Sequence, residues 1–212
     1  MDFEAARARL IEHLSLEIKD KRVLDAMSRV PRERFVLPNE EHLAYEDIPL
    51  PIGLEQTISQ PLIIAMMTQA LELTGKERVL EVGTGSGYQA AILAELAHYV
   101  VTTERFPALA EQARKVLNSL GYTNIEIYMA EETLGYQRKA PYDAIMVTAA
   151  APRVPTDLLA QLAIGGRMVI PVGSRHVQEL FKITRKRKGN ITRNLGGCRF
   201  VPLIGKGAWE ED

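Results

Sequence analysis

Between residues 78 and 173 the chain alternates short, β-rich apolar runs with segments of helical periodicity. The apolar runs predict strands over residues 78–82, 99–103, 125–129, 142–148 and 166–172. Apolar residues recur at helical spacing between most of these runs, over residues 88–97, 107–120 and 155–163. Because strands that alternate with helices are joined by right-handed crossovers, this pattern predicts a mostly parallel sheet with helices on both faces.

The pattern changes on either side of this region. Helical spacing over residues 3–30 predicts two short helices that end before Pro31, and residues 62–73 predict another helix. Prolines recur between residues 35 and 61, which argues against a long helix or a central strand there. Residues 178–185 and 191–203 predict two strands of an antiparallel hairpin, joined across residues 188–190.

These elements predict a single α/β domain over residues 1–212 with a doubly wound, mostly parallel sheet. We expect residues 1–75 to form an N-terminal helical extension that ends in a long irregular segment, and such segments in compact domains are usually functional or disordered. Residues 76–173 form the α/β core, and residues 174–212 form the C-terminal antiparallel hairpin and tail.

Composition narrows the classes of function. The 26 Lys and Arg residues nearly balance the 27 Asp and Glu residues, so we expect no general attraction to nucleic acid or to an anionic membrane. The only cysteine is Cys198, which excludes an intrachain disulfide, and the histidines lack ligand spacing, so we expect no metal site. No apolar stretch approaches the ~20 residues that span a bilayer, and residues 1–9 do not resemble a signal peptide. We therefore expect a soluble, cytoplasmic protein.

A glycine-rich turn follows the first predicted strand of the core and opens a helix, reading Glu81-Val82-Gly83-Thr84-Gly85-Ser86-Gly87-Tyr88. Such a turn lies at the carboxyl ends of the strands, where open α/β sheets bind ligands. Glu104 ends the next strand, where a carboxylate can accept hydrogen bonds from both ribose hydroxyls. We therefore predict a bound nucleoside.

The spacing of the loop decides among nucleoside ligands. A dinucleotide fingerprint needs a glycine where this chain has Tyr88, and the carboxylate of Glu81 suits an ammonium group better than a pyrophosphate. Ser86 lacks the flanking glycines of a hydrolase nucleophile elbow, and the loop lacks the Gly-Lys-Ser/Thr of a P-loop.

The pattern E-x-G-x-G-x-G resembles motif I of S-adenosylmethionine-dependent methyltransferases. Other motifs, in the same order along residues 29–209, resemble the protein-L-isoaspartate O-methyltransferase family. They are Thr57-Ile58-Ser59-Gln60-Pro61, Tyr142-Asp143-Ala144-Ile145, Thr148-Ala149-Ala150-Ala151-Pro152, Gly165-Gly166-Arg167-Met168-Val169-Ile170-Pro171-Val172-Gly173 and Arg199-Phe200-Val201-Pro202-Leu203. The resemblance implies a Rossmann-like methyltransferase fold and transfer of a methyl group from S-adenosylmethionine to the α-carboxylate of L-isoaspartyl residues. Its implied partners are damaged peptides and proteins.

The resemblance also implies roles for single residues. Ser59 matches the active-site serine, which would orient the acceptor, and Glu104 matches the ribose-binding acid. The other residues expected at the cofactor are Thr57, Ile58, Glu81, Gly83, Gly85 and Gly87. The family's Gly-Asp-Gly after the third strand is replaced by Ala130-Glu131-Glu132, so Glu131 and Glu132 are the candidates for the adenine contact.

Alternatives remain for several of these assignments. Ser59 could only cap the helix that follows it, since serine is a favoured cap. The basic run 185–188 could be a solvated hairpin tip or an RNA-binding patch. The same cofactor domain could serve a methyltransferase that acts on RNA or a small molecule, or a module that only senses S-adenosylmethionine.

Overall fold

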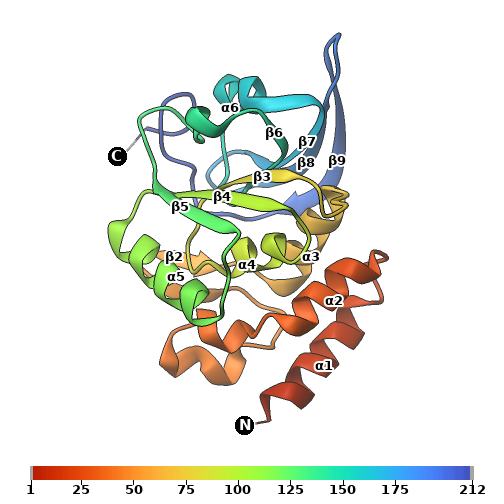
Figure 1. Cartoon of the computed structure of the whole chain (residues 1–212), viewed down its shortest axis with the longest axis vertical. Helices are drawn as coiled ribbons and strands as arrows, with labels where there is room; N and C mark the ends of the chain where they lie inside the picture. The colour runs from red at the N-terminus through yellow and green to blue at the C-terminus, as the bar shows by residue number, and fades with distance from the viewer. Residues whose placement is uncertain (1, 211–212) are drawn as a thin grey trace.

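The centre of the fold is a seven-stranded sheet, seen in a computed structural model that describes residues 2–210 (Figure 1). The strand order is β5-β4-β3-β6-β7-β8-β9. Strands β3 to β7 are parallel, and β8 and β9 are each antiparallel to the strand before them, which confirms the predicted sheet and hairpin. The strands are β3 (Arg78–Val82), β4 (Tyr99–Glu104), β5 (Ile125–Met129), β6 (Tyr142–Val147), β7 (Leu162–Gly173), β8 (Gln178–Arg185) and β9 (Asn190–Cys198).

Strand β3 is the point at which the strand order reverses. Leu80 of β3 pairs with Val101 of β4 on one side and with Ile145 of β6 on the other. The loops after β3 and β4 therefore turn away from the loop after β6. In doubly wound sheets this divergence opens a crevice at the carboxyl ends of the strands.

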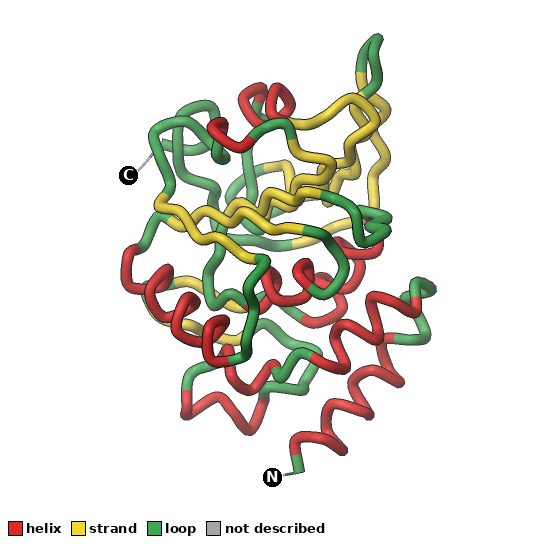
Figure 2. Tube along the Cα trace, in the orientation of Figure 1, coloured by secondary structure: helices red, strands yellow, loops and turns green. Residues whose placement is uncertain are grey.

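Helices cover both faces of the sheet, as Figures 1 and 2 show. On one face Val79 packs in a core with residues of α3 (Pro61–Ala70) and α4 (Tyr88–Ala94). On the other face Leu80 packs in a core with Leu158 of α6 (Thr156–Gln161). Alternate residues of β3 are thus buried on opposite faces, which explains why apolar residues, Val79 and Leu80, are adjacent in this strand. Helix α5 (Pro107–Ser119) lies beside α4.

The N-terminal region folds as the predicted pair of helices, α1 (Phe3–Leu14) and α2 (Lys21–Arg29). Each begins after an aspartate whose side chain accepts a backbone N–H at 3.0 Å, Asp2 from Ala5 and Asp20 from Arg22. The helices bury Leu14 against the same core as α4. They therefore form a layer outside α3 and α4 (Figure 1).

The proline-rich segment contains short elements that the sequence did not predict. Two 3-10 helices, η1 (Arg32–Phe35) and η2 (Pro38–Leu43), precede a small antiparallel hairpin of β1 (Leu50–Gly53) and β2 (Gln56–Ile58). A third 3-10 helix, η3 (Gln137–Lys139), lies outside this segment and precedes β6. These elements are too short to show a hydrophobic period.

The last strand was predicted too long. Strand β9 ends at Cys198, whereas the sequence suggested an end near Leu203. The backbone of Val201 and Leu203 instead pairs with Ala150, in the loop after β6, through two hydrogen bonds of 2.8 Å. Residues 201–204 therefore return to the carboxyl ends of the parallel strands.

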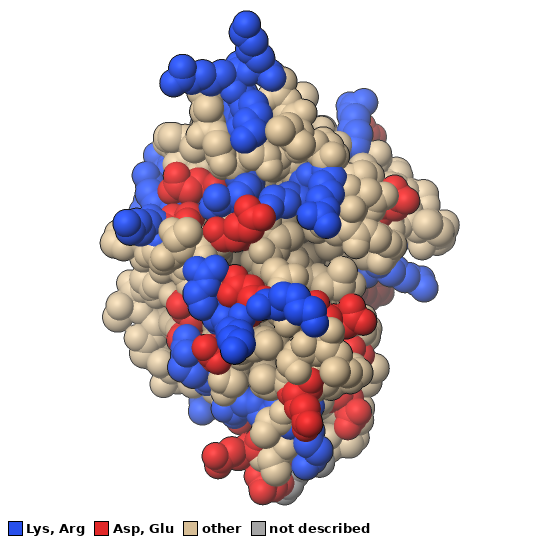
Figure 3. All heavy atoms as spheres, turned by 90° about the vertical axis from the view of Figure 1, so that its right-hand side faces the viewer, with Lys and Arg blue, Asp and Glu red and all other residues tan. Residues whose placement is uncertain are grey.

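The hairpin of β8 and β9 projects from the body of the protein and carries exposed Lys and Arg residues at its tip, visible at the top of Figure 3. The guanidinium of Arg185 donates to the carbonyls of Leu159 and Ala160, whereas residues 186–188 are exposed. Within residues 2–210 no helix has the length and apolar character needed to cross a membrane.

Candidate functional site

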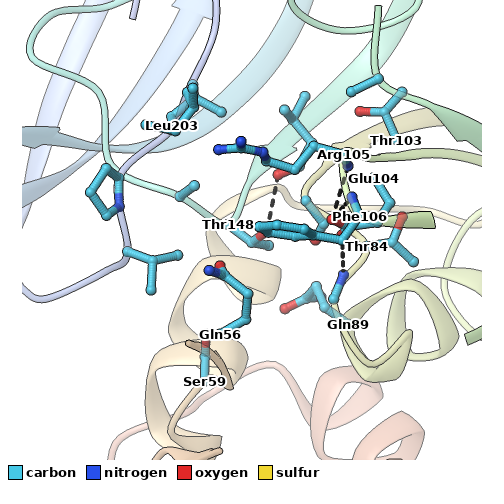
Figure 4. A pocket seen from close by; sticks show the side chains of 18 of the residues that line it. Gln56, Ser59, Thr84, Gln89, Thr103, Glu104, Arg105, Phe106, Thr148 and Leu203 are labelled. Carbon is cyan, nitrogen blue, oxygen red and sulfur yellow. Dashed lines mark hydrogen bonds between the residues drawn. The ribbon is translucent and has the colours of Figure 1, made fainter. Parts of the chain in front are cut away.

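A pocket lies at the crevice that the reversal of strand order predicts (Figure 4). Its walls are the segment after β1, the glycine loop, the turn after β4, the loops after β5 and β6, and residues 201–204. Of the residues expected at the site, the lining includes Thr57, Ile58, Ser59, Gly83, Gly85, Glu104 and Glu131. Three others, Glu81, Gly87 and Glu132, are not among the lining residues.

The glycine loop has positive φ at each of its three glycines, where side chains are rarely tolerated. Gly83 is also confined by Thr148, since a Cβ on Gly83 would lie 2.3 Å from the Thr148 hydroxyl oxygen. That hydroxyl lies 2.7 Å from the carbonyl of Gly83 and joins the loops after β3 and β6. Gly87 instead allows α5 to pack closely against the loop, because a Cβ on Gly87 would lie 3.2 Å from the Cβ of Ala113 in α5.

Glu104 ends β4 with its carboxylate held by backbone N–H groups. Oε2 accepts from Gly85 at 2.8 Å, and Oε1 accepts from Arg105 and Phe106 at 2.9 Å each. A carboxylate offers about four lone-pair positions. Three are used to hold the glycine loop against the turn after β4, and the rest can accept from a ribose hydroxyl.

Glu81 lies behind the glycine loop and is fully buried, contrary to the expectation that it faces the cofactor's ammonium group. The Thr102 hydroxyl donates to Glu81 Oε2 at 2.6 Å, so the Thr84 hydroxyl, 2.7 Å away, must donate to Thr102. Oε1 has no partner among the described residues. Burial raises the pKa of Glu81 to about 8; the Thr102 hydrogen bond opposes this shift, and the Glu104 charge adds to it.

We expect Glu81→Gln to stabilise the cofactor-free protein above pH 8 and to have little effect near pH 4.5. The folded-state pKa of about 8 exceeds the unfolded value of 4.5, so wild-type stability falls as pH rises between these values and then levels off. Glutamine keeps the acceptor for Thr102 and is neutral throughout. Thermal melts of both proteins from pH 5 to 9 measure the effect. A stability difference that stays constant across this range would show that Glu81 is ionised in the folded protein.

Ser59 follows the β1-β2 hairpin and points toward the pocket in Figure 4. The interpretation of Ser59 as a helix cap is wrong, because the residue before α3 is Gln60 and no side chain there makes a cap bond. Asp47 performs this function from another segment, accepting from Leu62 N and from Gln60 Nε2 at 2.8 Å each. The Ser59 hydroxyl is therefore not committed to the helix.

The acids after β5 are both exposed. Glu131 lines the pocket but forms an ion pair of 2.8 Å with Arg138. Glu132 does not reach the lining. Of the two candidates, only Glu131 lines the pocket, so the adenine contact is expected of Glu131 alone.

Several lining residues had no role assigned from the sequence. Arg105 and Phe106 follow Glu104 directly, Thr148 and Ala149 follow β6, and residues 201–204 close the pocket from the C-terminal side. The residues after β4 and β6 directly follow strands that the sequence predicts. The sequence could therefore have placed these four residues at the ligand crevice. Residues 201–204 carried no such signal, because their place depends on pairing with Ala150.

Fold and site together define the class of protein. The sheet is doubly wound, the glycine loop and Glu104 line one pocket, and Gly83 and Gly85 place backbone without a side chain at its wall. These are the features of a Rossmann-like methyltransferase.

Comparison with known proteins identifies the family. The family model of protein-L-isoaspartate(D-aspartate) O-methyltransferase matches residues 5–208, and the chain belongs to this family. The chain is 52% identical to a protein-L-isoaspartate O-methyltransferase of Geobacter metallireducens, over 99% of this chain and 98% of the relative. A relative with the same name from Methanoculleus marisnigri is 56% identical over 91% of this chain and 88% of its own length.

Solved structures agree with this assignment. A protein-L-isoaspartate O-methyltransferase matches with a TM-score of 0.84 and 28% identity, over 95% of this chain and 67% of the other. A beta-aspartate methyltransferase from Plasmodium falciparum, in complex with S-adenosyl-L-homocysteine, matches with a TM-score of 0.79 and 27% identity, over 91% of this chain and 95% of the other.

Proposed function

We propose that this protein transfers the methyl group of S-adenosylmethionine to the free α-carboxylate of L-isoaspartyl residues in damaged proteins and peptides. The observation that carries the proposal is the placement of Ser59 and its neighbours in the same pocket as the glycine loop and Glu104. One side of the pocket thus suits the cofactor and the other side suits an acceptor. Family membership supports the same activity.

The acceptor needs no general base. An isoaspartyl linkage runs through the side chain and leaves the α-carboxyl free, with a reference pKa of about 3.3 to 3.7, so it is an anion at neutral pH. The cofactor, when bound, supplies an electrophilic methyl group on a sulfonium. The chain's own residues then have to align the carboxylate with that methyl group.

Exclusion of water is the second requirement, because water solvates both opposite charges and slows their reaction. The apolar lining residues Ile58, Phe106 and Leu203 meet this requirement. Alignment in such a site can supply ~7 to 11 kcal/mol in favourable cases. In the proposed mechanism Ser59 orients the carboxylate by donating a hydrogen bond, and Glu104 and the glycine loop hold the nucleoside.

The methyl ester would then cyclise without further help from the enzyme, as the amide nitrogen of the following residue attacks the ester carbonyl and methanol leaves. Hydrolysis of the resulting succinimide allows return to a normal aspartyl linkage. The proposed partners are the substrates themselves, isoaspartyl peptides and proteins. The proposed location is the cytoplasm.

Activity should depend on the linkage of the residue and not on its charge. We expect a peptide with one isoaspartyl residue to be methylated, and the same peptide with a normal aspartyl residue to remain unmodified. Both peptides carry a carboxylate, so only the backbone around it differs. The measurement is transfer of a labelled methyl group to the two matched peptides.

Equal labelling of both peptides would indicate a general carboxyl methyltransferase. Labelling of neither, with S-adenosylmethionine still bound, would favour a sensing module or another acceptor. Addition of RNA to the same assay tests the remaining alternative.

A further inference from the structure

Arg32 of η1 is a fully buried residue beneath the acceptor side of the site. Its Nη2 donates to the carbonyl oxygen of Ser59 at 2.9 Å and lies 3.5 Å from that of Ile48. Its guanidinium carbon lies 4.9 Å from the centre of the Tyr88 ring. The side chain of Arg32 thus contacts both Ser59, on the acceptor side of the pocket, and Tyr88, which follows the glycine loop.

The charge of Arg32 has no carboxylate partner within ion-pair distance in the part of the chain that the structure describes. Nε and Nη1 make no hydrogen bond. Burial lowers the pKa of Arg32 to about 10, against the opposing effects of Tyr88, Asp47 and Tyr45, so the group is charged at neutral pH. Stability does not account for such a residue, since a buried charge without a partner is unfavourable and apolar replacements of buried ionic groups are often neutral or stabilising.

The hydrogen bond to Ser59 has a geometric consequence. It fixes the carbonyl of Ser59, and with it the peptide plane between Ser59 and Gln60, so it limits the directions in which the Ser59 hydroxyl can point. Tyr88 is the first residue of α4, is buried, and packs edge-on against Phe35 of the same 3-10 helix as Arg32. The ring is therefore a fixed surface against which the guanidinium is held.

We propose that Arg32 is a positioning residue for methyl transfer, which sets the orientation of Ser59 relative to the glycine loop by bridging the Ser59 carbonyl and the ring of Tyr88. This role rests on the proposed function of Ser59. Arg32 does not line the pocket, so it is not a residue that would contact the acceptor or the cofactor. Its effect on the reaction passes through Ser59.

The first test is Arg32→Met, which keeps an unbranched apolar side chain that reaches about as far as Nε and removes the guanidinium with its charge and donors. We expect kcat with an isoaspartyl peptide to fall at least about tenfold, while the melting temperature stays the same or rises and the affinity for S-adenosylhomocysteine changes less than about threefold. A purely structural arginine would show the reverse, with a lower melting temperature and normal turnover per folded molecule.

The second test is a double-mutant cycle of Arg32→Met with Ser59→Ala. If Arg32 acts through Ser59, the double variant should turn over no more than about threefold slower than Ser59→Ala alone. Multiplicative losses would overturn the proposal, because they would show that Arg32 acts independently of Ser59. Loss of turnover in Ser59→Ala together with wild-type turnover in Arg32→Met would also overturn it, while leaving the proposed function intact.

Arg32→Lys keeps the test decisive if Arg32→Met does not fold. Lysine retains the charge and a donor for the Ser59 carbonyl but loses the planar group that lies on Tyr88, so we expect a kcat between those of the wild type and Arg32→Met. The same cycle with Ser59→Ala then applies to this variant. Failure of both variants to fold would assign Arg32 to the fold alone and overturn the proposal.

Discussion

Replacement of Ser59 by alanine should lower kcat about a hundredfold to a thousandfold with little change in stability. The expected loss is that of one hydrogen-bond donor in a water-poor site, roughly 2.7 to 4 kcal/mol by analogy with oxyanion-binding donors. Little stability should be lost, because the Ser59 side chain makes no cap bond to α3. The measurement is kcat at saturating isoaspartyl peptide and S-adenosylmethionine, with a thermal melt of the same preparation.

Asp47→Ala provides the matched control. Asp47 holds the first turn of α3 through its bonds to Leu62 and Gln60, so its loss should cost about 0.5 to 2 kcal/mol of stability and change turnover per folded molecule far less. Ser59→Ala that turns over at more than half the wild-type rate would remove Ser59 from the reaction.

Replacement of Glu104 by alanine should raise the dissociation constant for S-adenosylmethionine at least about tenfold. A hydrogen bond to a charged group contributes about 1.5 to 3 kcal/mol, and about 1.4 kcal/mol corresponds to tenfold in affinity. The structure adds a second cause, because the carboxylate also holds the backbone of Gly85, Arg105 and Phe106. The variant should therefore loosen the glycine loop as well as lose the ribose contact. Calorimetric titration measures the affinity.

Glu104→Gln separates these two causes. Glutamine keeps one acceptor oxygen, which can still bind the N–H groups of Arg105 and Phe106, but its amide cannot accept from Gly85. We expect an affinity between those of the wild type and Glu104→Ala. An unchanged dissociation constant in a folded Glu104→Ala variant would show that Glu104 does not bind the cofactor.

The parallel core was predictable because each of its elements leaves a local signal. Strands buried on both faces are marked by apolar runs, as at residues 144–147 of β6, and the helices between them have a period of their own. The glycine loop and Glu104 could be placed at the site for the same reason, since both stand directly after such strands. The short hairpin of β1 and β2 was missed, because its strands of four and three residues are too brief for any period to show.

The sequence by itself determined the order of the elements, the parallel sheet, the position of the glycine loop and the choice of nucleoside, because these depend on residues close together in the chain. Only the tertiary structure decided where the side chains of those motifs point. Glu81 belongs to the loop motif, yet it is buried against Thr102, 21 residues away, and Ser59 is released from the helix end by Asp47. Arg32 meets Ser59 across 27 residues, and residues 201–204 reach the pocket by pairing with Ala150. Such contacts join segments that have no common local pattern, so they exist only once the chain has packed.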